Sequence, residues 1–159
     1  MKFQRTLAAG AGLLGATTAI AVGAPAIAAT GNGRADSGTA YISIVHQQGS
    51  SLYAAGYNVD KLFGATAVTY VVAVGPSTPG TFKIKAKAVT LYTRDGALTG
   101  TGSATQFTTP SGAETVRDGK LSLTHGTGGQ AHHTVTATFS GTYDPKAGAY
   151  TFHYKGIYR

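Results

Sequence analysis

Histidines are the first residues in this sequence whose type suggests chemistry. His132 and His133 follow a glycine-rich segment, and His153 lies near the C-terminus. Neighbouring residues of a strand point to opposite faces, so His132 and His133 cannot both hold one metal ion. The predicted turn at residues 144–148 places His153 nearer to Ser140 than to His132. We therefore expect solvated histidines, with neither a metal site nor a cofactor.

Nucleophilic and acid–base catalysis find little support in the remaining residue types. A serine nucleophile on an elbow needs the pattern Gly-x-Ser-x-Gly, and Gly102-Ser103 lacks the second glycine. Most acidic residues fall in predicted turns or in an N-terminal leader, namely Asp36, Asp95, Asp118 and Asp144. Asp60 and Glu114 remain, which is too few for a persuasive acid–base pair. We predict no catalytic residue, and the residue types favour a protein that is not an enzyme.

Three lysines form a basic row on one predicted strand. Lys83, Lys85 and Lys87 share a face at intervals of roughly 7 Å. Such a row could bind an anionic cell-envelope polymer, but nucleic acid is not expected. Val89 and Leu91 continue that face, where bases would need interleaved aromatic residues. The simpler interpretation, which we favour, is that the charges keep an exposed strand soluble and unpaired.

A dense aromatic set shares one face of the last two predicted strands. Its members are Phe139, Tyr143, Tyr150, Phe152, Tyr154 and Tyr158. His133 lies on the same face, near the start of its strand. If this face lines a barrel, apolar walls with a few hydroxyl groups would bind a small hydrophobic ligand. The alternative is a barrel filled by its own side chains, with the tyrosine hydroxyl groups reaching water.

Alternation of apolar and polar residues with a period of two dominates from residue 39 onward, and we find no amphipathic helix. Short turns interrupt it, which predicts about eight antiparallel strands in an up-and-down barrel; a two-sheet sandwich is the alternative. Mid-strand glycines such as Gly141 and Gly156 favour closure, since glycine often marks a barrel corner. Residues 47–64 allow no assignment.

Two details of strand placement follow from the same pattern. On the predicted strand 81–94, Ala86 and Ala88 face the interior, opposite the basic row. Asp118-Gly119 is expected to be a hairpin turn that joins strands at 115–117 and 120–124, because Asp-Gly favours two-residue turns.

The N-terminus has the layout of a secretory signal. Lys2 and Arg5 precede an uncharged stretch, and Ala26-Ile27-Ala28 is a suitable cleavage site. We expect a signal peptide at 1–29, a flexible leader at 30–38 and a single β-barrel domain at 39–159. The mature protein would be secreted, without stable membrane insertion.

The C-terminal half resembles small secreted bacterial β-barrels of the calycin type, in particular allene oxide cyclase-like and dirigent-like barrels. The resemblance lies in strand rhythm and turn spacing, in segments such as GALTGTGSATQF and FSGTYDPKAGAYTFHYKGIYR. Dirigent-like proteins carry a GGTG-x-aromatic-x-Gly signature, and the segment Gly126–His132 lacks its aromatic residue and spaced glycine. The resemblance implies the fold and an apolar cavity, and we transfer no catalytic residue from it.

Composition narrows the functions further. The 159 residues carry a net charge of +7 and contain neither cysteine nor tryptophan. This excludes a disulfide scaffold, thiolate metal sites and a cysteine nucleophile.

Three functions remain. The first is a non-enzymatic barrel that binds a small apolar or aromatic ligand or a cell-envelope component. The second is an isomerase or cyclase for a small hydrophobic substrate, which would need His133, Glu114 or Arg117 in the cavity. The third is a surface interaction protein that uses its threonine-rich outer face and the basic row.

Overall fold

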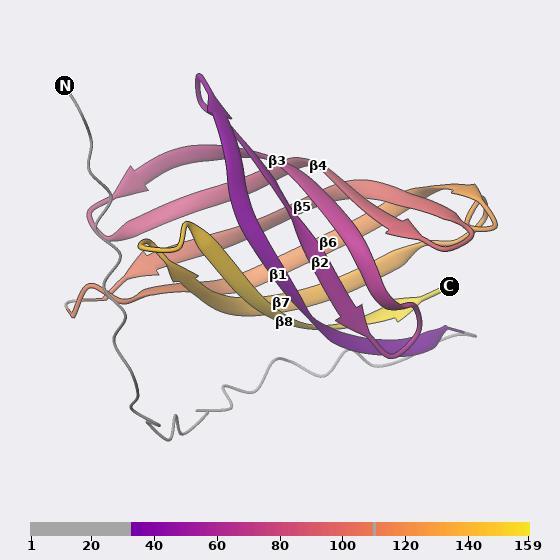
Figure 1. Ribbon diagram of the computed structural model, residues 1–159. Helices are drawn as coiled ribbons and strands as arrows, with labels where there is room; N and C mark the ends of the chain where they lie inside the picture. Colours follow the sequence, from indigo (N-terminus) through magenta and orange to yellow (C-terminus); the bar gives the residue numbers. More distant parts are fainter. Residues whose placement is uncertain (1–32, 110) are drawn as a thin grey trace, which may run out of the picture.

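The protein is a closed antiparallel barrel of eight strands, each paired with the next along the chain (Figure 1). The computed structural model describes residues 33–109 and 111–159. The strands are β1 (Arg34–Gln48), β2 (Ser51–Asp60), β3 (Gly64–Thr78), β4 (Thr81–Thr93), β5 (Gly96–Thr108), β6 (Glu114–Gly128), β7 (Val135–Asp144) and β8 (Ala149–Tyr158). The predicted up-and-down barrel is confirmed. The expected signal peptide at 1–29 lies outside the described residues.

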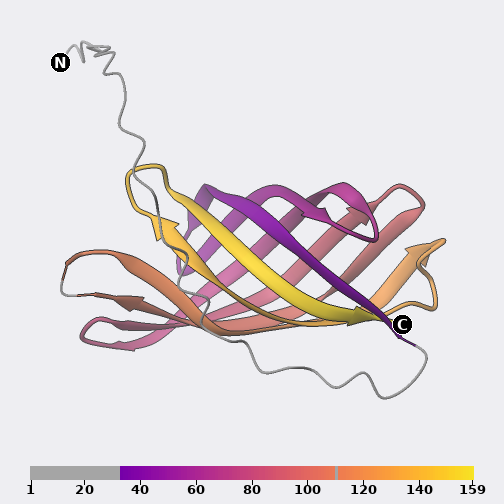
Figure 2. The same cartoon turned by 90° about the horizontal axis from the view of Figure 1, so that it is seen from below.

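Pairing of the first strand with the last closes the barrel. The register of β1 with β8 runs from Arg34 opposite Tyr158 to Ser43 opposite Ala149, and Figure 2 shows the two strands side by side. The turns after β2, β4 and β6 lie at one end, which we call the Asp60 rim. Those after β1, β3, β5 and β7 lie at the other end, the Glu114 rim.

Side chains that alternate inward along the strands form the core. Val89, Leu98, Val116 and Leu123 are almost completely buried. Glycine lets neighbouring strands approach closely, as at Gly141, where a Cβ atom would lie 2.0 Å from the carbonyl oxygen of Thr151. The apolar interior and the close backbone packing together specify a tightly curved barrel.

A bulge in β4 corrects the prediction for that strand. Its register with β5 passes from Ala86 opposite Gly102 to Val89 opposite Gly100, so β4 contains one residue more than β5 over this stretch. The extra residue reverses the alternation: Ala88 is exposed, whereas Val89 is buried. The predictions that Ala88 faces inward and that Val89 and Leu91 continue the outer face are wrong.

A second bulge replaces the predicted turn at Asp118-Gly119. Strand β6 runs through both residues, and its register with β7 shifts between Val116 and Gly119. Asp118 has a φ of 54°, which accommodates the extra residue. The Asp-Gly pair therefore bends one long strand instead of joining two short ones.

The N-terminal strands are longer than the sequence indicated. β1 begins at Arg34, inside the segment predicted to be a flexible leader, and the unassigned stretch 47–64 contains β2. Both differences matter for function, because these segments supply polar side chains to the barrel interior.

Candidate functional site

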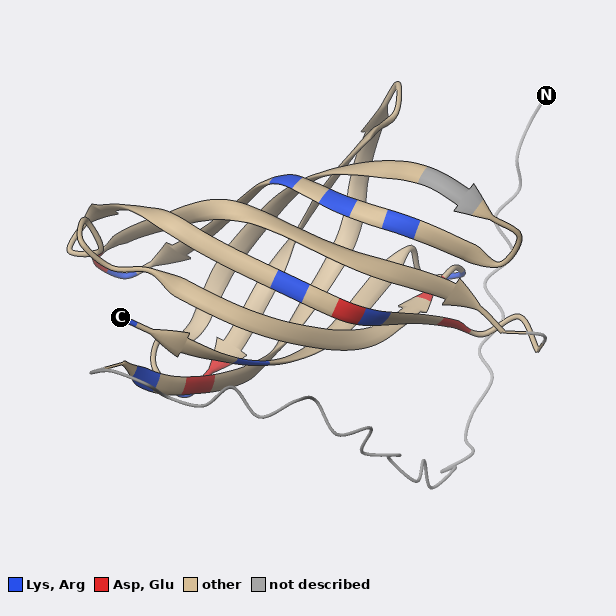
Figure 3. Ribbon diagram, turned by 180° about the vertical axis from the view of Figure 1, so that it is seen from behind, with Lys and Arg blue, Asp and Glu red and all other residues tan. Residues whose placement is uncertain are grey.

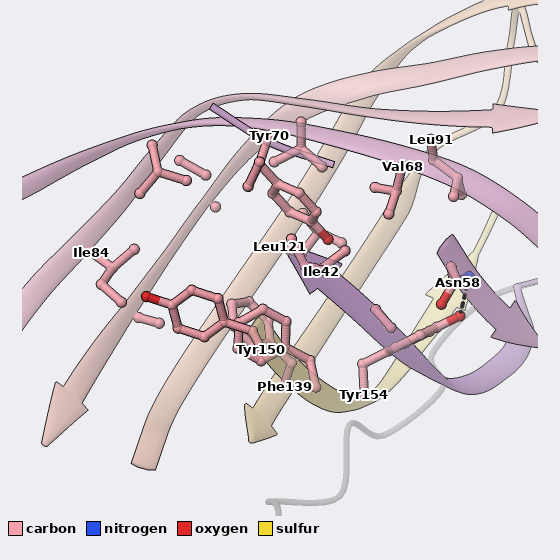
Figure 4. A pocket seen from close by; sticks show the side chains of 18 of the residues that line it. Ile42, Asn58, Val68, Tyr70, Ile84, Leu91, Leu121, Phe139, Tyr150 and Tyr154 are labelled. Carbon is pink, nitrogen blue, oxygen red and sulfur yellow. Dashed lines mark hydrogen bonds between the residues drawn. The ribbon is translucent and has the colours of Figure 1, made fainter. Parts of the chain in front are cut away.

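The barrel encloses a cavity of about 110 Å³, to which all eight strands contribute side chains. Its walls are almost entirely apolar, with Ile42, Val68, Leu91 and Leu121 among them (Figure 4). Alanines at inward positions such as Ala86 leave this space open, because their side chains are too short to reach the barrel axis. The interior is therefore not completely filled by its own side chains.

Four of the seven predicted interior residues line this cavity: Phe139, Tyr150, Phe152 and Tyr154. Tyr143 packs against Tyr150 instead, with ring centroids 4.4 Å apart. Tyr143 therefore supports the wall from outside the cavity.

Tyr158 and His133 lie beyond the Asp60 rim of the cavity. The Tyr158 hydroxyl donates to Oε1 of Gln130 at 3.1 Å, and its ring packs edge-on against Phe63. His133 stacks on Tyr158 at 4.7 Å, and its Nδ1 lies 3.1 Å from the carbonyl oxygen of Arg159. Neither residue of this pair lines the cavity.

Asn58 is the central polar residue at the Asp60 rim. Its side-chain nitrogen donates to Oδ2 of Asp60 at 2.6 Å and to the hydroxyl of Tyr154 at 2.9 Å. Figure 4 shows Asn58 and Tyr154 together at one end of the cavity. Because a carboxylate only accepts, the contact with Asp60 fixes which end of the amide carries the nitrogen.

The amide oxygen of Asn58 is buried and has no hydrogen-bond partner among the described residues. Asn58 lines the cavity and is only 5% exposed. Thr66, opposite Asn58 on β3, has an unpartnered buried hydroxyl group as well. A buried polar atom without a partner is costly, so this end of the barrel has unused hydrogen-bonding capacity.

Two carboxylates lie at this rim. Asp36 lines the cavity and is 8% exposed, while Asp60 accepts from the backbone N–H groups of Leu62 and Phe63. Burial, followed by the nearby charge of Asp60, raises the pKa of the Asp36 carboxyl. Burial is also the main reason that the pKa of Tyr154 is well above its usual value. The Asp60 rim is thus rich in acceptors and disfavours negative charge.

The Glu114 rim is polar as well. The buried hydroxyl group of Thr115 has no partner among the described residues, but Tyr150, Gln106 and Glu114 hydrogen-bond to one another. Tyr150 donates to Oε1 of Gln106 at 3.0 Å, and the side-chain nitrogen of Gln106 donates to Glu114. Burial raises the pKa of Tyr150 to about 12. Tyr70 lies on the cavity wall between the two rims, and burial raises its pKa to about 12 as well. Both phenols are neutral near pH 7.

Sequence reasoning missed the two most informative residues of this site. Asp36 was assigned to the leader, and Asn58 lay in the unassigned stretch. The alternation of Asp36, Gly38, Ala40 and Ile42 was the available signal for Asp36, since these residues share a strand face with period two.

The residues expected for an isomerase are not in the cavity. His133 stacks on Tyr158, the guanidinium of Arg117 lies 5.8 Å from the ring centroid of Phe107 on the outer surface, and Glu114 contacts Gln106. No three His, Asp or Glu side chains within residues 33–109 and 111–159 come together as a metal site would require. His153 is opposite Ser140, as predicted, and lies 3.1 Å from the hydroxyl group of Thr39.

Outside the barrel, the basic row is part of a wider positive surface. Lys83 is in register with Thr105 and, beyond it, Arg117; Lys85 is likewise in register with Ser103 and Lys120. We call the group Lys83, Lys85, Lys87, Arg117 and Lys120 the basic surface. Figure 3 shows a cluster of blue segments on neighbouring strands of one side of the barrel, with a red segment among them. Asp118 lies between Arg117 and Lys120 on β6.

Comparisons with protein-family models, with curated proteins and with solved structures find no match to the chain. In the described part of the chain, no helix has the length and apolarity needed to cross a bilayer.

Proposed function

We propose that this protein is a secreted, non-enzymatic barrel that binds a small apolar or aromatic molecule in its central cavity. The observation that carries the proposal is the apolar cavity of about 110 Å³, with a polar group at each end. Apolar cavities of on the order of 150 Å³ admit benzene, so a single aromatic ring is the appropriate size. The fold-level resemblance to calycin-type barrels, which implies an apolar cavity, supports the same function.

Filling the cavity tests this proposal. Ala86 lines the cavity, and Ala88, two residues along the same strand, is exposed outside it. Ala86→Leu should abolish binding of toluene or benzene, measured by protein chemical-shift changes on titration, because its side chain would occupy the space. Ala88→Leu is the matched control and should bind as the unaltered chain does. Failure of the unaltered chain to bind either probe would reject the proposal.

The basic surface favours a second candidate function, which is binding of an anionic cell-envelope polymer. Hydroxyl residues separate its cations across β5, so each cation can contact a different phosphate. Lys83 Nζ donates to Thr105 Oγ1 at 2.9 Å, and this hydrogen bond orients the Lys83 side chain on the basic surface.

Charge replacement tests this second function. Retention on immobilised poly(glycerol phosphate) should fall with rising salt and be lost in the triple variant Lys83→Gln, Lys85→Gln, Lys87→Gln. A matched triple variant, Lys61→Gln, Arg94→Gln, Lys146→Gln, removes the same charge from exposed positions elsewhere. Equal loss in both variants would show that only net charge matters and would reject a specific surface.

A further inference from the structure

The two ends of the cavity differ in what they offer to a ligand, and this difference carries a further inference. At the Glu114 rim, Tyr150 and Gln106 use their polar atoms on each other and on Glu114. At the Asp60 rim, the buried oxygen of Asn58, a residue that lines the cavity, remains without a partner among the described residues. A polar ligand group therefore gains most at the Asp60 rim.

The unused atom at this rim that belongs to a cavity-lining residue is an acceptor, because Asn58 lines the cavity and Thr66 is not among the lining residues. The side-chain nitrogen of Asn58 is committed to Asp60 and Tyr154, so the free atom is the amide oxygen, which can only accept. The ligand must supply an N–H or O–H group. A ligand carboxylate or ether oxygen would leave the Asn58 oxygen unpaired and would meet two carboxylates.

The charges at the rim select between the two kinds of donor. Asp36 and Asp60 lie close enough for the charge of one to disfavour ionisation of the other. The described cations nearest to them in the chain and in the strand register are Arg34 on β1, Lys61 in the turn after β2 and Lys155 on β8, all exposed to solvent. A cation inside the cavity would relieve the repulsion between the two carboxylates, whereas a neutral hydroxyl group would not.

We propose that the Asp60 rim binds the protonated amino group of a small aromatic amine, whose ring fills the apolar cavity. The ammonium donates to the Asn58 oxygen and pairs with Asp36. This inference rests on the proposed function, since it identifies the class of ligand for the same cavity.

Three probes of nearly equal shape test the inference on the full chain. Toluene has no donor, benzyl alcohol has a neutral donor, and benzylamine has a cationic one. Benzylamine should bind roughly tenfold or more tightly than toluene, with benzyl alcohol between them, because a hydrogen bond to a charged group contributes more than a neutral one. Dissociation constants from chemical-shift titration near pH 7 provide the measurement.

The outcomes separate the two proposals. If toluene binds as tightly as benzylamine, the cavity is a ligand site and the amine inference is overturned. If benzyl alcohol binds best, the donor is neutral and the inference is again overturned. If none of the probes binds, both the proposed function and the amine inference are rejected.

Two variants test whether Asp36 and Asn58 cause the preference for benzylamine over toluene. Asp36→Asn keeps the shape of the side chain and should reduce the preference for benzylamine over toluene to within about threefold, because the charge partner is gone. Asp144→Asn, at an exposed turn of the opposite rim, is the matched control and should leave the preference unchanged. Asn58→Ser, which removes the amide oxygen, provides a second variant and should also lower the preference for benzylamine. A preference that persists in both site variants would overturn the inference.

Discussion

The hydroxyl group of Tyr154 on β8 accepts a hydrogen bond from the side-chain amide of Asn58 on β2, across the intervening strand β1. Gly38 of β1 is in register with both Asp60 and Tyr154 and makes this contact possible. A Cβ atom at Gly38 would lie 2.7 Å from the Tyr154 hydroxyl and 2.9 Å from the Cβ atom of Asp60. The missing side chain opens the space through which the two residues meet.

Replacement of this glycine should therefore destabilise the barrel. We expect Gly38→Ala to lower the free energy of unfolding by about 1–3 kcal/mol, as overpacking does, measured by urea denaturation. Gly75→Ala is the control, because a Cβ atom there would lie at an ordinary 3.4 Å from the carbonyl oxygen of Lys83. Equal stability of the two variants would contradict the role of Gly38.

The stability of the protein should respond to pH through Asp36. Its raised pKa means that the folded protein holds the proton more tightly than the unfolded chain. This contribution favours folding below the unfolded value of 3.8 and is lost as pH rises through the folded pKa. Asp36→Asn should therefore raise the free energy of unfolding near pH 7 and leave it nearly unchanged near pH 3. A larger gain in acid than at neutral pH would contradict this assignment.

Alkaline conditions should unfold the protein through its buried tyrosines. Burial raises the pKa of Tyr70 to about 12, so its phenol stabilises the folded state below about pH 10 and loses that contribution between about pH 10 and 12. The slope is about 1.4 kcal/mol per pH unit for this group. Spectrophotometric titration should show tyrosines that ionise only near pH 12, with one fewer in Tyr70→Phe. An unchanged titration curve in that variant would show that Tyr70 ionises normally.

The bulge in β6 gives a prediction for Asp118, whose φ is 54°. A β-branched residue is strained in that conformation, so Asp118→Val should lower the free energy of unfolding by about 1–2 kcal/mol. Asp118→Gly removes the same charge without the strain and should not destabilise. Thermal or urea unfolding of the two variants separates backbone strain from loss of charge, and equal losses would exclude strain as the cause.

The architecture could be predicted from the sequence because most strands alternate cleanly and are separated by short turns. The strand of Phe139 and the strand of Tyr154 show this best, and both residues reach the cavity as their alternation indicates. Alternation fails where a strand contains an extra residue, as between Ala86 and Val89. No particular residue type marks the position of a bulge, so the orientation of neither Ala88 nor Asp118 could be predicted from the sequence alone.

The polar end of the cavity was harder to predict for a different reason. Asp36 and Asn58 line the same cavity only because the strands of the barrel pair in one particular register, which a single sequence does not specify. Their residue types also favour loops over strands, so local propensity pointed away from the observed structure. Burial of these two residues is decided by the closed barrel, not by their neighbours in the sequence.

The seam between β1 and β8 has a consequence for the chain as a whole. Arg34 is in register with Tyr158, so the two ends of the described barrel lie beside each other. The eight pairings form an unbroken ring in which no strand has a special position as first or last. A circular permutant in which Arg159 leads into Gly33, with new ends in the turn between β3 and β4, would therefore retain every strand pairing and the cavity that the strands enclose.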